Sequence, residues 1–161
     1  MKKILLILLF ISVQKIFCQK NNDTISGEKF MKILVKQFTM NKPDESFFLM
    51  PEGSGYESTL LGIKVKWLTM PTTLNKIKAN YKNSDFSDSI TIRKNKIDAF
   101  LTFKDEISPD TSKYDNYKII NSFIQIDRDY IINITAAFPK KQEYFIKQKL
   151  IDSFFTIKEI P

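Results

Sequence analysis

The hydrophobic positions of this chain switch between two spacings, one typical of strands and one typical of helices. The clearest alternation covers residues 130–138, where Tyr, Ile, Ile, Ala and Phe side chains face one way while Asn133 and Thr135 face the other. Residues 63–67 alternate in the same manner, with two lysines on the polar side. Residues 117–126 are apolar on both faces, which predicts a central strand.

Three other segments carry apolar residues at the spacing of one-faced helices. The first covers residues 28–38, and the second begins after Pro71 with a threonine as its N-cap. The third opens at Pro139 and runs to about Ser153, with Glu143 near its start and lysines towards its end, as the helix dipole favours. The apolar stripes expected of the first two helices are Phe30, Ile33, Leu34 and Phe38, and then Leu74, Ile77 and Tyr81.

The remaining segments complete the order helix, two strands, helix, four strands, helix, strand. Further strands are expected at residues 46–50, 89–93, 97–103 and 154–157, with a polar loop at residues 105–116. Short turns between strands indicate antiparallel pairing, and each one-faced helix must bury its stripe against the sheet. The pattern predicts a single α+β domain over residues 27–161, an antiparallel β-sheet flanked by helices.

The start of the chain predicts an export signal. Met1-Lys2-Lys3 precedes an apolar run of about ten residues, too short for the ~20 that cross a bilayer as a helix. We therefore expect a signal peptide at residues 1–19, a flexible tail at residues 20–26, and a periplasmic or secreted product, most simply of a Gram-negative bacterium. Cleavage removes three lysines, so the net charge falls from +7 to +4.

Cys18 is the single cysteine, so the expected mature domain has no disulfide. Lipidation of Cys18, as in a bacterial lipoprotein, is the alternative to plain cleavage. The bulky residues Ile16 and Phe17 disfavour it, because lipoprotein signals carry small residues just before the cysteine.

Composition excludes several kinds of chemistry. The chain has no histidine, which rules out Ser-His-Asp and Cys-His nucleophile activation and the usual zinc and copper sites. It has no glycine-rich phosphate loop, and its lysines are scattered among acidic residues, unlike the clustered basic face of a nucleic-acid binder. We expect no catalytic residue, no cofactor, no metal and no nucleic-acid partner.

Two carboxylate-based alternatives stay open at this point. A glycosidase needs two opposed acids, and the candidates are Glu52, Glu57, Asp105, Glu106, Asp115, Asp127 and Asp129. The acidic segment 105–115 lacks the ligand spacing and the central glycine of a calcium loop, which favours a solvated loop.

Aromatic residues beside the long loops are the candidates for contact with a partner. They are Trp67, Tyr56, Tyr114 and Tyr117, together with Asp115. Exposed loops often carry function, and aromatic side chains anchor many interfaces. Core packing is the alternative explanation for any of these rings.

Two short motifs allow a modification. Asp23-Thr24-Ile25 and Asp88-Ser89-Ile90 resemble the O-glycosylation site of some bacterial envelope proteins. Asp-Ser and Asp-Thr pairs also occur simply in turns and caps, so both interpretations stay open.

Four segments within about residues 46–160 carry a family resemblance. They are the strands KIINSFIQI (118–126) and YIINITAAFP (130–139), the helix end DSFFTI (152–157), and the strand and helix of Val65 to Tyr81. In these segments the chain resembles the PsbP and DcrB families. The resemblance implies a sheet sandwiched by helices and a non-catalytic role, because these families are exported accessory or envelope proteins and some relatives act as chaperone-like adaptors.

The function expected from these patterns is that of an exported, non-enzymatic module. It would bind a protein partner or an envelope component outside the cytoplasm, with no membrane-spanning segment in the mature chain. The alternative is an immunity protein that blocks a toxin delivered to the periplasm, because a small exported chain without catalytic residue types suits that role equally well.

Overall fold

The computed structural model describes residues 26–82, 88–107 and 116–161. The chain falls into two compact units, residues 1–31 and residues 32–161. The first helix, α2 (Gly27–Leu34), begins in one unit and ends in the other. The predicted signal peptide, Cys18 and all but the last residue of the predicted tail lie outside the described residues.

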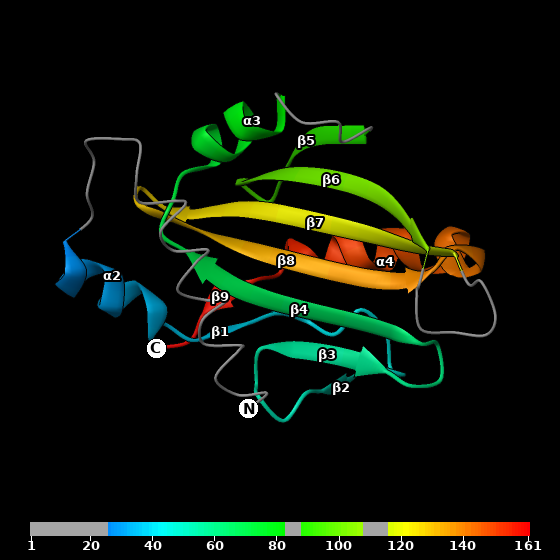
Figure 1. Ribbon diagram of the computed structural model, residues 1–161. Coiled ribbons are helices and arrows are strands. Elements are labelled where there is room, and N and C mark those ends of the chain that lie inside the picture. Colours follow the sequence, from blue (N-terminus) through cyan, green and yellow to red (C-terminus); the bar gives the residue numbers. More distant parts are fainter. Residues whose placement is uncertain (1–25, 83–87, 108–115) are drawn as a thin grey trace, which may run out of the picture. The chain divides into compact units, whose positions relative to one another are not determined.

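A seven-stranded antiparallel sheet dominates the second unit (Figure 1). In sheet order its strands are β2 (Phe48–Leu49), β3 (Gly55–Ser58), β4 (Ile63–Met70), β8 (Tyr130–Pro139), β7 (Asn116–Asp127), β6 (Ile97–Ile107) and β5 (Asp88–Lys94). The other elements are α3 (Leu74–Lys82), the short helix η1 (Lys140–Gln142), α4 (Glu143–Phe154), and a separate pair of strands, β1 (Phe38–Thr39) and β9 (Lys158–Glu159). The predicted α+β class with an antiparallel sheet is confirmed.

One face of the sheet packs against α4, and we call it the inner face. The predicted alternation of β8 holds, because Ile132, Ile134 and Phe138 all point to this face and are 0 % exposed. Leu150 and Phe154 of α4 are equally buried against them. Two-residue alternation on the strand and three- to four-residue spacing on the helix thus bring two apolar surfaces together.

The opposite face, which we call the outer face, packs against α3. Leu74 and Ile77 form a second buried cluster with side chains of β6, β7 and β8. The ring of Tyr81 lies 5.6 Å from that of Phe100 and 5.4 Å from that of Phe123. All three predicted stripe residues of this helix therefore face the sheet. Because α3 has only nine residues, it covers part of the outer face, and no other helix in the described ranges covers the rest.

Two hydroxyl groups at the end of α4 hold the segment that follows β1. Ser153 Oγ donates to the carbonyl oxygen of Asn41. Thr156 Oγ1 accepts a hydrogen bond from the Asn41 amide at 2.7 Å and donates to the Ser153 carbonyl at 2.6 Å. One turn earlier, Lys149 Nζ lies 2.6 Å from a carboxylate oxygen of Asp44. Helix α4 is thereby fastened to residues 41–44 as well as to the sheet.

The Asp44 contact predicts a pH dependence of stability. Hydrogen bonds from Lys149, and from the amide and hydroxyl of Ser46, lower the pKa of Asp44 from 3.8 to about 2. A lowered pKa in the folded state stabilises the fold above pH 3.8, and that contribution disappears as the pH falls towards 2. Asp44→Asn should therefore cost about 1 kcal/mol at neutral pH, because the pair is partly solvated.

The measurement is the free energy of unfolding in urea for both proteins between neutral pH and pH 2.5. The difference between wild type and Asp44→Asn should shrink as acid protonates Asp44. Lys149→Gln is the matched control, because it should reproduce the loss at neutral pH and add little to Asp44→Asn in the double variant. A constant difference down to the lowest pH would contradict the assignment.

Several elements differ from those predicted. The helix predicted at 28–38 ends at Leu34, and Phe38 reaches the core from β1 instead, where it pairs with Glu159. The strand predicted at 154–157 is the end of α4 and the turn after it, and β9 begins only at Lys158. Strand β3 was not predicted. The error at residues 154–157 arose because apolar residues buried at a turn look the same in sequence as those of a strand.

Candidate binding surface

The outer face beyond α3 carries a row of polar side chains across three strands. Thr135 of β8, Asn121 of β7 and Thr102 of β6 lie side by side in the register. Thr135 Oγ1 donates to Asn121 Oδ1 at 2.8 Å, and Asn121 Nδ2 donates to Thr102 Oγ1 at 3.5 Å. The polar groups of this row satisfy one another. Thr102 is 1 % exposed and also bonds to Tyr81, so the row begins at the edge of α3 and extends away from it.

We call the uncovered part of the outer face the open face. Its side chains come from five adjacent strands, β3, β4, β8, β7 and β6. They are Glu57, Lys64, Lys66, Thr135, Ala137, Tyr117, Ile119, Asn121, Lys104 and Glu106. Within the described ranges no helix lies over them. The three lysines are exposed, whereas the tyrosine, isoleucine and alanine are half-buried.

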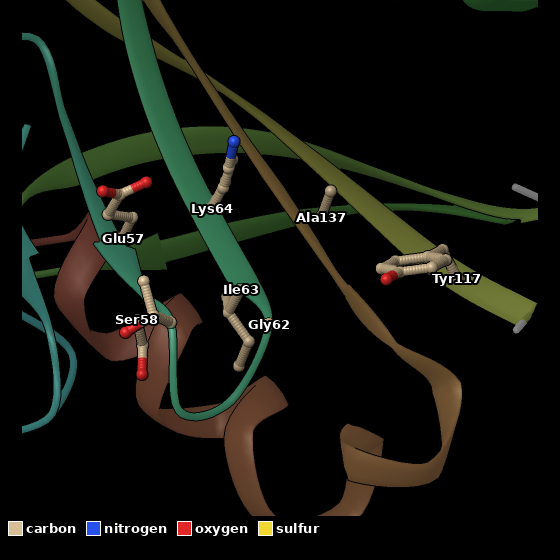
Figure 2. Close-up of a pocket in the computed structure, with 8 residues that line it drawn as sticks. Glu57, Ser58, Gly62, Ile63, Lys64, Tyr117 and Ala137 are labelled. Carbon is tan, nitrogen blue, oxygen red and sulfur yellow. The ribbon is translucent and has the colours of Figure 1, made fainter. Parts of the chain in front are cut away.

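A shallow hollow of about 360 Å³ lies at one end of the open face (Figure 2). Glu57 of β3 is directly opposite Lys64 of β4, and Lys64 is directly opposite Ala137 of β8. The ring of Tyr117 on β7 lies on the far side of Ala137 from Lys64. The hollow is lined by Glu57, Ser58, Thr59, Gly62, Ile63, Lys64, Tyr117 and Ala137.

The turn between β3 and β4 shapes the near wall of the hollow. Gly62 has a φ of +67°, a left-handed conformation that glycine adopts without the steric cost of a side chain. The Leu61 amide donates to Ser58 Oγ at 3.3 Å, and Gln142 Nε2 donates to the Leu61 carbonyl at 3.0 Å. These contacts fix the turn against η1 and hold Glu57 and Lys64 in register beside it.

The groups around the hollow suit recognition better than catalysis. One carboxylate, one ammonium group and one phenol ring offer ion pairing, hydrogen bonding and a flat apolar surface. None of them pairs a nucleophile with a base, which covalent catalysis requires. The described part of the chain also brings together no three histidine, cysteine, aspartate or glutamate side chains that could hold a metal ion.

A second charged group lies at the same end of the sheet but on the inner face. Lys118 Nζ lies 3.0 Å from Glu143 and 3.5 Å from Asp105, and Lys140 Nζ lies 2.7 Å from Asp105. Burial alone would raise the pKa of Glu143, yet hydrogen bonds from Lys118 and Lys147 outweigh it and lower that pKa. A hydrogen bond from Lys140 likewise lowers the pKa of Asp105.

This charged group serves the fold. A general acid needs a raised pKa, and in the described ranges every carboxyl group with a shifted pKa is shifted downward. Glu143 begins α4 and Lys118 belongs to β7. Their ion pair therefore fastens the first turn of α4 to the sheet.

The aromatic residues proposed from sequence separate onto two faces. Trp67 points to the inner face, is 7 % exposed, and its ring lies 5.6 Å from that of Tyr56. Tyr56 is half-buried and donates its hydroxyl hydrogen to the Met40 carbonyl at 2.8 Å. Both rings pack in the core, whereas Tyr117 lines the hollow on the outer face. Tyr114 and Asp115 lie outside the described residues.

The candidate acids and modification sites are also dispersed. Glu57 lines the hollow, Asp105 and Glu106 are held near lysines at the end of β6, and Asp127 accepts from the Arg128 amide in the turn after β7. Ser89 is exposed on β5, and Asp23-Thr24-Ile25 lies outside the described residues. The pairing of Glu57 with Lys64 was missed from sequence, because it depends on the register of β3.

No helix in the described ranges is long and apolar enough to cross a membrane. No family model matches the chain, and no curated protein matches it. Nine chains of solved structures match it. One is a crystal structure from Bacteroides thetaiotaomicron VPI-5482 at 1.50 Å resolution, with 10% sequence identity and a TM-score of 0.43. The match covers 78% of this chain and 42% of that chain, so this chain spans less than half of that protein's length.

Proposed function

We propose that this chain is an exported, non-enzymatic binding protein that holds a protein partner of the cell envelope through the open face of its sheet. The observation that carries the proposal is the outer face beyond α3, which no described helix covers, with Lys64, Glu57 and Tyr117 gathered around a hollow. Aromatic residues are enriched at protein contacts and charged residues occur at their polar rim, so the ring of Tyr117 beside these charged side chains supports a contact role.

The partner's chemistry follows from the residues of the open face. Lys64, Lys66 and Lys104 outnumber Glu57 and Glu106, and Lys104 already lies 3.6 Å from Glu106. The free positive charge is therefore concentrated on β4. A complementary partner presents carboxylates to the two lysines of β4 and an apolar or aromatic side chain to Tyr117.

Export and accessory function rest on the N-terminal pattern and on the resemblance to the PsbP and DcrB families. The antiparallel sheet with a helix against each face agrees with the architecture that the resemblance implies. The accompanying measurement is the N-terminal sequence of the native protein from the periplasmic fraction. It should begin at Gln19 or Lys20, and a cytosolic protein that retains Met1 would overturn the proposed compartment.

Binding should depend on the hollow. Partner captured from an envelope extract is purified, and its affinity for wild type is compared with that for Lys64→Glu and Tyr117→Ala by isothermal titration calorimetry. Each substitution should weaken binding about tenfold, because a charge reversal or a lost ring at the centre of an interface costs more than 1 kcal/mol. Circular dichroism establishes that both variants are folded.

Lys141→Glu is the matched control, because it makes the same charge reversal at an exposed position of η1, outside the open face. It should bind like wild type. If Lys64→Glu and Lys141→Glu lost the same affinity for the partner, the loss would follow from net charge alone, and the proposed site would be wrong. A captured toxin that loses its activity in the complex would identify the immunity function instead of the accessory one.

A further inference from the structure

The two edge strands of the seven-stranded sheet differ in how well they are protected from pairing with a strand of another chain. At one edge, β2 has only two residues, and very short edge strands resist pairing with other chains. At the other edge, β5 runs for seven residues, Asp88–Lys94, without proline. Its register with β6 is continuous from Asp88↔Phe103 to Lys94↔Ile97, so no bulge twists it away. Among the described strands, none lies beyond β5 (Figure 1).

The backbone groups on the outer side of β5 can be identified from its hairpin. Asn95 and Lys96 form a two-residue turn, with φ angles of 53° and 64°, as in a type I′ hairpin. The closing pair Lys94↔Ile97 of such a hairpin exchanges both backbone hydrogen bonds, and bonded pairs then alternate along the ladder. The even-numbered residues of β5 therefore bond to β6. The N–H and C=O groups of Ser89, Thr91 and Arg93 point outward.

The sequence of β5 is complementary to itself when a second copy runs antiparallel about Thr91. In that register Thr91 faces the partner's Thr91, and Ser89 faces the partner's Arg93. All of these residues direct their backbone groups outward, so the pairing forms hydrogen bonds at both positions. A two-fold axis through a bonded pair is one of the symmetric arrangements that an antiparallel ladder permits.

The side chains agree with this register. Asp88 at one end of the strand faces the partner's Lys94 at the other end, and by symmetry the ion pair occurs twice. Between the ends, Ile90 faces the partner's Ile92. Ile90 is 49 % exposed, and the contact with the partner's Ile92 would bury part of its side chain. Opposite charges and β-branched pairs directly across two strands both stabilise a sheet.

We propose that the protein self-associates by antiparallel pairing of β5 with β5 of a second copy about Thr91, which joins the two sheets into one. Lys94 already lies 2.5 Å from Asp152 on α4, and in the dimer its ammonium group is shared with the partner's Asp88. The proposal is independent of the open face, because β5 lies at the edge farthest from β3 and β4. A contact along a single strand edge is small, so the dimer is weak and depends on concentration.

The test measures the mass of the mature protein by sedimentation at concentrations between about 1 µM and about 1 mM, the range in which small interfaces form. Wild type should approach the dimer mass as concentration rises. Asp88→Lys and Lys94→Glu each place like charges opposite each other twice, and each should raise the dissociation constant about tenfold or more. An equimolar mixture of the two variants restores both ion pairs and should dimerise like wild type.

The mixture separates this register from a general effect of charge or of misfolding. Lys141→Glu should dimerise as wild type does, and Thr91→Pro, which removes an outward N–H without touching the ladder to β6, should stay monomeric and folded. A wild type that is monomeric throughout would overturn the proposal. Dimers that form equally well in both charge-reversal variants would also overturn it. So would two monomeric variants that do not dimerise when mixed, a result that would instead fit pairing of β5 with a different extended peptide.

Discussion

Replacing Gly55 with alanine is expected to lower the free energy of unfolding by about 2–3 kcal/mol, the range for an extra methyl group forced into a packed site. A Cβ at this position would lie 2.5 Å from the Val65 carbonyl oxygen and 2.9 Å from Met50 Sδ. The methionine can move, but the carbonyl belongs to β4 in the middle of the ladder. Relief of the overlap must therefore displace β3 from β4.

The measurement is urea unfolding of Gly55→Ala beside Gly53→Ala as the matched control. Gly53 has a φ of +70°, and a Cβ added there would meet no atom within 4 Å, so its substitution carries a conformational cost alone. That cost is about 1 kcal/mol. If both variants lost the same stability, the steric argument for Gly55 would be wrong.

Gly55 also explains why β3 was missed from sequence. The segment Gly55–Ser58 reads as part of a turn, because a glycine opens it and its apolar content is a single tyrosine. Its position in the sheet is decided by the close approach of backbones that only a glycine permits. Neither hydrophobic alternation nor propensity records that contact, so the Glu57 and Lys64 pair could not be predicted either.

Long regular elements were predictable for the opposite reason. In β8 five side chains alternate inward, and in the hairpin of β5 and β6 a short polar turn lies between two runs that contain apolar residues. Both signals are local and repeat over many residues. The length of β8 also made its inward and outward faces predictable, which placed Thr135 on the outer face in advance.

The candidate aromatic residues show where local reasoning ends. The alternation of residues 63–67 already put Trp67 on the apolar side of its strand, whereas Tyr117 lies between Asn116 and Lys118 and had no such assignment. Trp67 is an odd-numbered residue of β4 and points inward with Val65, whereas Tyr117 shares the outer face with Asn121. Which face of a sheet a helix covers depends on tertiary packing. The open face becomes visible only once α3 is seen to cover β6 and β7 near Phe123.

Replacing Gln125 with alanine should be among the most damaging single changes outside the core. Its Oε1 accepts a hydrogen bond from the Leu74 amide at 2.6 Å, at the first turn of α3. Its Nε2 donates to the Tyr130 carbonyl at 3.1 Å and also to the Asp127 carbonyl, across the irregular register between β7 and β8. The predicted threonine cap is present, because Thr73 Oγ1 accepts from the Lys76 amide at 3.4 Å, and Gln125 adds a second cap at the Leu74 amide while it closes the turn of the central hairpin.

Loss of the cap and of the two hydrogen bonds from Nε2 should together cost about 2–3 kcal/mol, since a helix cap contributes about 1 kcal/mol and each hydrogen bond about 0.5–1.5 kcal/mol. The loss of stability should appear first in α3 and only then in the whole fold. Without the cap, the start of α3 lifts from the outer face, and Ile77 and Tyr81 lose their contacts with Phe100. Hydrogen exchange should therefore accelerate at the amides of α3 more than at those of α4.

Gln125→Glu separates the two roles of this side chain. A carboxylate keeps the acceptor for the Leu74 amide but has no donor for the Asp127 and Tyr130 carbonyls, and it places a negative charge beside them. This variant should retain slow exchange in α3 yet unfold more easily at neutral pH. Protonation restores one donor and removes the charge, so the new carboxyl group has a raised pKa in the folded state. Its stability should recover towards wild type as the pH falls through that raised pKa, and the recovery should be complete at about pH 4, the pKa of a glutamate in the unfolded chain. An α3 that exchanges equally fast in Gln125→Glu and Gln125→Ala would show that Gln125 is not its cap, and the open face would then be bounded by sheet packing alone.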